Sequence, residues 1–175
     1  MKKCYHSTQR KAILAIFWSL LGILVYVGIR YEFRFALGAV IALFHDVFIA
    51  FGAVSVANKE VSLTVVAALL TLAGYSINDT IVVFDRIRER GRALRKEGLV
   101  KVFDTSVNET LSRTVITAFT VFLTVLALYF LGGEVIHDFS YVMLVGVVFG
   151  TYSSVYVASA LALDIALVRQ KKVRK

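Results

Sequence analysis

The chain has 175 residues, of which 58% are hydrophobic, and a formal net charge of +8. Soluble domains contain roughly 45–50% apolar residues, so this composition is that of a membrane protein. The absence of proline suits long uninterrupted helices. A single cysteine excludes a disulfide framework within the chain, and three histidines on separate segments predict no metal site.

Five long apolar runs predict membrane-spanning helices. Runs 12–29, 114–133 and 139–163 carry no charged side chain, and two more are interrupted only by His45–Asp46 and by Asp79. A transmembrane helix needs about 20 predominantly apolar residues, whereas barrel strands are shorter and alternate. We therefore predict an all-α membrane protein whose bundle, residues 12–168, has five helices at about 12–29, 35–57, 61–85, 112–131 and 140–167.

Three segments lie outside these helices. Residues 1–11 form an N-terminal segment, and residues 169–175 form a basic tail. Residues 86–111 carry a dense basic run followed by apolar residues at helical spacing, which predicts an amphipathic helix at the membrane surface. This helix has two open roles, either an orientation signal that contacts lipid or a specific partner site.

The distribution of Lys and Arg predicts the orientation of the bundle. With the N-terminus outside and the C-terminus in the cytoplasm, the inner segments carry fifteen basic residues and the outer segments five. Cytoplasmic loops of membrane proteins carry such an excess. The positive charge therefore reflects topology, and no aromatic-interleaved basic module predicts nucleic-acid binding.

An outward N-terminus requires a route into the membrane. The first apolar run is long and is closed by no small-residue cleavage site, so it is not a cleavable signal peptide. We expect an earlier helix and an external domain upstream of Met1, separated from this chain by truncation or by a split gene.

The rest of the chain is organised around residues 74–89, which read GYSINDTIVVFDRIRE. Asp79 lies inside a predicted span, where a charged and unpaired carboxylate costs several kcal/mol, and such groups almost always face the bundle interior. It shares one helix face with Ala67, Thr71 and Tyr75 at four-residue spacing. Polar groups that accompany it within the motif are Ser76, Asn78, Thr80, Asp85 and Arg86.

Arg113 begins the helix that follows the long inner segment. Two antiparallel helices joined in this way can place Arg113 beside Asp79. Thr117, Thr120 and Thr124 continue one polar face of the same helix. This face predicts either the lining of a hydrated path or hydrogen bonds between helices.

Asp46 is the second acid inside a predicted span, about 16 Å from the helix start at 1.5 Å per residue. It lies among Gly38, Ala42 and Ala50 on a face of small residues that favours close helix packing. Two interpretations stay open: a proton or hydration site beside Asp79, or a structural acid hydrogen-bonded to a neighbouring helix. His45 is interpreted as a structural hydrogen-bonding residue.

The last predicted helix carries small residues at strict four-residue spacing, which predicts an extended packing stripe. The members of this stripe are Gly146, Gly150, Ser154, Ala158 and Ala162.

The motif at 74–89 resembles the signature of the SecF members of the SecD/SecF family, the partners of SecD in Sec-dependent protein export. Residues 30–47, 112–133 and 150–163 resemble further helices of the same family, so the resemblance covers nearly all of residues 15–165. In the family pattern a first helix and a periplasmic domain precede these helices, and we expect both to lie upstream of Met1.

The resemblance implies a fold like helices 2–6 of one half of an RND-superfamily transporter, in a bacterial or archaeal cell membrane. It implies an auxiliary subunit that couples the proton motive force to export, without a cofactor. Asp79 would carry the proton with Arg113 as its charge partner, and Asp46 is a weaker candidate. The implied partners are a SecD-like subunit, the Sec translocon channel, the translocating preprotein and membrane lipid.

Two other functions remain open at this point. The chain could be half of an RND-type proton-coupled exporter of small solutes, or a structural or assembly subunit without ion coupling. We predict no enzymatic activity, because the sequence has no phosphate-binding glycine loop, no nucleophile with a base and no metal cluster.

Overall fold

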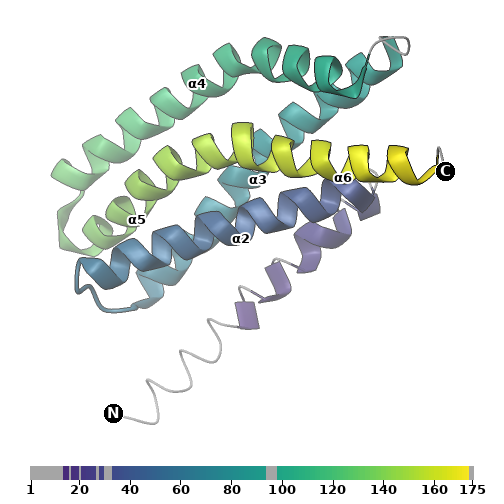
Figure 1. The fold of residues 1–175 in the computed structure, drawn as a ribbon. Helices are drawn as coiled ribbons and strands as arrows, with labels where there is room; N and C mark the ends of the chain where they lie inside the picture. The colour runs from purple at the N-terminus through teal and green to yellow at the C-terminus, as the bar shows by residue number, and fades with distance from the viewer. Residues whose placement is uncertain are drawn as a thin grey trace.

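The computed structural model describes residues 14–15, 17–19, 21–26, 28–29, 33–93 and 98–173. These residues form helices and turns and contain no β-strand. Figure 1 shows the long helices side by side, with chain reversals at both ends of the bundle. The helices are α2 (Phe33–Val56), α3 (Leu63–Ala93), α4 (Leu99–Leu131), α5 (Gly133–Tyr152), the π-helix η1 (Ser153–Val157) and α6 (Ala158–Val173).

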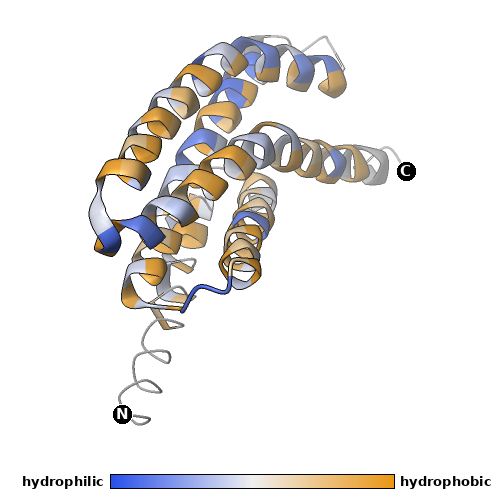
Figure 2. Cartoon of the chain, turned by 90° about the vertical axis from the view of Figure 1, so that its left-hand side faces the viewer, coloured by the Kyte–Doolittle hydropathy of each residue, from blue (hydrophilic) through white to orange (hydrophobic). Residues whose placement is uncertain are grey.

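Four helical segments of the described chain are long and apolar enough to cross a membrane. They are Phe35–Val56, Leu63–Arg92, Leu99–Leu131 and Gly133–Val168, the last of which runs through α5, η1 and α6. Apolar residues cover much of the helix surface, and polar residues gather at the helix ends (Figure 2). The prediction of an all-α, multi-pass membrane protein is therefore confirmed, while the predicted helix at 12–29 is described only in part.

The inner segment differs from its predicted form. Instead of a separate surface helix over 86–111, α3 extends to Ala93 and α4 already begins at Leu99. The apolar stripe of this region packs against protein, since Phe103 is buried and its ring stacks 6.4 Å from that of Phe35. Phe35 also contacts Phe84 of α3 at 5.0 Å. Because apolar side chains of the chain itself cover this stripe, both helices extend beyond their predicted boundaries.

Small residues allow the long C-terminal helix to approach two neighbours. A methyl group on Gly146 would lie 2.5 Å from the side chain of Leu72 on α3. A methyl group on Gly38 of α2 would lie 3.4 Å from the carbonyl oxygen of Ala158. Helices in lipid associate through such close contacts, because no hydrophobic force drives them together. The predicted stripe therefore faces α3 in its first half and α2 in its second half.

The turn between α2 and α3 closes with a Schellman motif. Asn58 takes a positive φ of 52°, and its N–H donates to the Ser55 carbonyl at 3.0 Å. The Lys59 N–H donates to the Val54 carbonyl at 3.1 Å, so the last carbonyls of α2 are satisfied. Ser62 then caps α3 by accepting the Val65 N–H at 3.3 Å.

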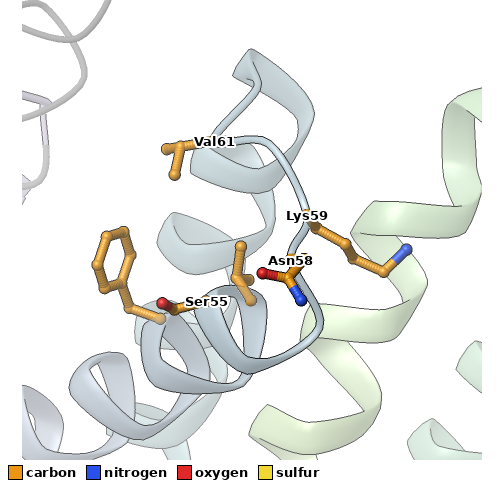
Figure 3. A pocket seen from close by; sticks show the side chains of 6 residues that line it. Ser55, Asn58, Lys59 and Val61 are labelled. Atoms are coloured by element: carbon orange, nitrogen blue, oxygen red, sulfur yellow. The ribbon is translucent and has the colours of Figure 1, made fainter.

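A hollow of about 330 Å³ lies at this turn, where the Lys59 side chain extends toward the neighbouring helix (Figure 3). The Lys59 ammonium donates to the Asp138 carboxylate of α5 at 2.5 Å. His137 lies beside this pair, and its ring contacts that of Tyr129 on α4 at 4.3 Å. The ion pair and the ring contact join the α2–α3 turn, α4 and α5 at this end of the bundle.

The close approach at Gly146 predicts a stability difference between two glycines. Gly146→Ala should lower the free energy of unfolding by about 1–3 kcal/mol, because overpacking forces Leu72 to move. Gly52→Ala is the matched control, since a methyl group there meets no atom within 4 Å. Unfolding of both variants in detergent micelles measures the difference. Equal stability of the two variants would contradict the described contact between α3 and α5.

Candidate functional site at Asp79

Helix α3 lies at the centre of the bundle, where it packs against α2, α4, α5, η1 and α6. This position buries the motif that it carries, so that Asp79 is only 3% exposed. Ser76 and Thr80 are buried beside it, whereas Asn78 points to the exposed side of the helix. The polar residues that were predicted to accompany Asp79 therefore divide between two faces.

One oxygen of the buried Asp79 carboxyl group makes no hydrogen bond within the described chain. Its Oδ2 atom has no partner among the described residues. Two other buried polar atoms are likewise unpartnered, the hydroxyl group of Tyr75 on α3 and Oγ1 of Thr114 on α4. Buried polar groups in native proteins are mostly hydrogen-bonded, and exceptions often mark a functional role. The structure thus singles out Asp79 as the atypical acid of the bundle.

Arg113 lies within electrostatic range of Asp79 but does not touch it. The guanidinium attracts the carboxylate through a Coulomb interaction. No direct ion pair joins the two side chains in the described part of the chain, and Arg113 remains exposed. The antiparallel arrangement of α3 and α4 therefore brings the predicted charge partner near Asp79 without fixing it there.

The three threonines of the predicted polar face are satisfied within their own helix. Thr117 donates to the Arg113 carbonyl at 2.9 Å, Thr120 to the Thr117 carbonyl at 2.8 Å, and Thr124 to the Thr120 carbonyl at 2.9 Å. Of the two predicted roles for this face, hydrogen bonds to another helix are not seen among the described residues.

Asp46 has the opposite environment to Asp79. It is 1% exposed, yet Ser76 Oγ of α3 donates to its Oδ2 atom. His45 Nδ1 lies 3.1 Å from the other carboxylate oxygen. Gly150 of α5 allows the helices to approach here, because a methyl group on it would lie 3.6 Å from Oδ2. Asp46 is thus held by hydrogen bonds at the crossing of α2, α3 and α5.

The π-helix η1 extends this polar contact. Ser154 Oγ donates to the Ser76 carbonyl at 3.1 Å, and Thr80 Oγ1 donates to Ser154 Oγ at 3.2 Å. A π-turn inserts one residue into a helix and often occurs at functional sites. The four-residue spacing of the sequence indicated only a packing stripe at Ser154 and neither the π-turn nor its hydrogen bonds. The adjacent pair Ser153–Ser154, both fully buried, was the available signal.

The polar end of the motif forms an ion network with α4. Arg86 Nε donates to Glu109 at 2.7 Å, and Arg86 Nη1 donates to Glu89 at 2.6 Å. Arg90 Nε donates to the same Glu109 carboxylate at 2.8 Å. Arg86, Glu89 and Glu109 border an open cavity of about 480 Å³, which Asp85 and Arg113 also line. The polar end of the motif therefore lines a charged cavity between α3 and α4.

A metal centre has no support in this region. Within residues 33–93 and 98–173, no three His, Cys, Asp or Glu side chains are grouped so that they could hold a metal ion.

Comparison with known proteins assigns the family. The model of the family described as "Protein export membrane protein SecD/SecF, C-terminal" matches residues 3–168. The chain belongs to this family. The predicted helices and the Asp79 motif lie inside the matched range. The resemblance that the motif indicated is thus confirmed over most of the chain.

Named relatives point to the SecF side of the family. The chain is 51% identical over 165 residues to the protein translocase subunit SecF of Calditerrivibrio nitroreducens, covering 93% of this chain and 54% of that protein. It is 50% identical over 166 residues to SecF of Escherichia coli O157:H7, covering 93% of this chain and 51% of that protein. The chain thus spans about half the length of the curated relatives it matches.

Solved structures of SecDF share the fold. SecDF in its super-membrane-facing form matches with a TM-score of 0.88 and 44% identity, over 95% of this chain and 23% of that chain. SecDF from Thermus thermophilus, a translocon-associated membrane protein, matches with a TM-score of 0.85 and 45% identity, over 94% of this chain and 22% of that chain.

The hydrogen bond between Ser76 and Asp46 predicts a local stability effect. Ser76→Ala should cost about 1–3 kcal/mol, because it leaves a buried carboxylate oxygen without its donor. Thr71→Ala on the exposed side of α3 is the control, since its hydroxyl bonds only to Ala67 of the same helix. Unfolding in detergent compares the two variants. A Ser76→Ala protein as stable as the control would contradict the anchoring role of this bond.

Proposed function

We propose that the chain is the membrane bundle of a SecF-type subunit that couples the proton motive force to Sec-dependent protein export. The identity to proteins named protein translocase subunit SecF favours protein export over small-solute export. The single observation that carries the coupling is the Asp79 carboxyl group, which is buried, lacks a hydrogen bond at Oδ2 and is under the influence of Arg113.

Two opposing effects make such a carboxyl group suitable as a proton carrier. Removal from water favours the neutral acid, whereas a nearby cation favours the carboxylate. Because Arg113 is close but not bonded, a small movement of α4 against α3 changes the balance between the two effects. When Arg113 approaches, Asp79 releases its proton; when Arg113 withdraws, Asp79 takes one. Opposed effects of this kind are typical of functional acids.

The proton reaches the motif at the end of the bundle where α3 and α4 are joined. The charged cavity there contains Arg113 and Thr110, and its polar lining can hold several water molecules. Val82, one helical turn from Asp79, also lines it. A movement of Arg113 within this cavity therefore changes both the charge and the water available to Asp79.

Asp46 serves as an anchor rather than as a second carrier in this proposal. Its two carboxylate oxygens already have Ser76 and His45 as partners, and breaking these contacts would separate α2 from α3. The interpretation of Asp46 as a structural acid is the one that its hydrogen bonds support.

The partners follow from the family and from the exposed surface. A SecD-like subunit completes the RND-type bundle, and the Sec translocon channel and the preprotein are the further partners. The α4 span is 17% buried within the described chain, the lowest share among the four spans. We assign this face to the partner subunit and to lipid, with exposed apolar side chains at Val115, Ile116, Phe119, Leu123 and Leu128.

The coupling is tested by Asp79→Asn in a reconstituted, full-length complex with the SecD-like subunit. The substitution keeps the size of the side chain and removes the titratable group. Assembly should be retained, and the stimulation of export by a proton gradient should be lost. Asp164→Asn, on an exposed acid of α6, is the control and should leave stimulation intact. Normal stimulation by Asp79→Asn would reject this residue as the carrier, and loss of assembly would instead indicate a structural role.

The proposed orientation is tested with engineered cysteines in a Cys4→Ser background of the full-length protein. Glu134→Cys, at the start of α5, should react with a membrane-impermeant thiol reagent added outside the cell membrane. Gly98→Cys, before α4, should react only after the membrane is permeabilised. Both native residues are exposed, so burial does not explain a difference. The reverse labelling pattern would overturn an outer N-terminus and a cytoplasmic C-terminus.

A further inference from the structure

Tyr75 lies one helical turn before Asp79 on the same face of α3. Side chains four residues apart in a helix have Cβ atoms about 5–6 Å apart. The Tyr75 ring is half-buried, but its hydroxyl oxygen is fully buried and makes no hydrogen bond with the described residues. A buried phenol normally finds a partner for its O–H group, so this hydroxyl group requires an explanation.

The two unpartnered groups are chemically complementary. A phenol O–H can donate, and an ionised carboxylate can only accept. The Asp79 Oδ2 atom lacks a donor, the Tyr75 hydroxyl lacks an acceptor, and the two groups interact electrostatically. The two groups belong to side chains one helical turn apart on α3.

A second acceptor for the same phenol lies on α5. Thr151 is close enough to interact with the Tyr75 hydroxyl. Its own proton is donated to the Val147 carbonyl at 2.7 Å, which leaves the Thr151 oxygen as an acceptor. The phenol therefore has a choice between an acceptor on its own helix and one on the neighbouring helix.

We propose that Tyr75 is a positioning residue whose hydroxyl group follows the charge state of Asp79. When Asp79 is ionised, Tyr75 donates to its carboxylate; when Asp79 is protonated, Tyr75 donates to Thr151 of α5.

Hydrogen bonds to charged groups are shorter and roughly twice as strong as neutral ones. The charge on Asp79 thus decides which acceptor Tyr75 takes. Protonation of an acid on α3 is in this way transmitted to α5, on the side of Asp79 away from the cavity that contains Arg113. This inference rests on the proposed function, because it requires Asp79 to change its charge.

Infrared difference spectroscopy of the full-length complex tests the inference without measuring export. The difference spectrum between the protonated and ionised states of Asp79 should contain a phenol C–O band that reports the change of acceptor. This band should vanish in Tyr75→Phe, which removes one hydroxyl group and keeps the ring. It should also vanish in Asp79→Asn, which removes the trigger. The matched control Tyr141→Phe removes a hydroxyl group that donates to the Ala53 carbonyl at 3.3 Å, and should leave the band unchanged.

Export measurements complete the test. Tyr75→Phe should retain assembly with the SecD-like subunit and lower the proton-driven part of export about tenfold, as expected for loss of one hydrogen bond to a charged group. Tyr141→Phe should export normally. If Asp79→Asn abolishes stimulation but Tyr75→Phe exports normally or the wild-type spectrum lacks the phenol band, the role of Tyr75 is rejected and the proposed function stands. If Asp79→Asn exports normally, both are rejected.

Discussion

The burial of one carboxyl group without a partner is the constraint on which the rest of this bundle depends. Asp79 is 3% exposed and lacks a hydrogen bond at Oδ2 within the described chain. An uncompensated carboxylate in a membrane costs several kcal/mol, so the surrounding helices must provide this position at the expense of stability. Proteins accept such local costs mainly at functional sites. The proposed exchange of a proton at Asp79 explains why the chain keeps this destabilising group.

The surrounding helices are held by contacts that leave Asp79 free. Small residues bring α5 and α6 against α3 and α2, and hydrogen bonds join Asp46, Ser76 and Ser154 across three elements. Both carboxylate oxygens of Asp46 thus have a partner, whereas Asp79 Oδ2 has none in the described chain. Satisfied polar networks in a low-dielectric interior fix one arrangement of the elements that they join. In the proposed mechanism, the hydrogen-bonded Asp46 is the fixed point against which α4 moves relative to Asp79.

The charged groups of α3 and α4 divide into a fixed and a free set. Glu109 binds Arg86 and Arg90, which ties the two helices together beyond the apolar region. Arg113 lines the same cavity but forms no ion pair with Asp79 in the described chain. Ion pairs therefore join the two helices beside this cavity, while Arg113 is not held by an ion pair to Asp79.

The sequence by itself determined the fold class and the approximate place of the described spans, and it made Asp79 a candidate site residue, because hydropathy and helical period are local properties. It also predicted the small-residue faces at Gly38 and Gly146. Only the tertiary structure decided that Asp46 is hydrogen-bonded and Asp79 is not, that Ser154 lies in a π-turn, and that α4 begins at Leu99. These features depend on how far each helix is rotated and shifted against its neighbours, and packing between distant segments sets that register.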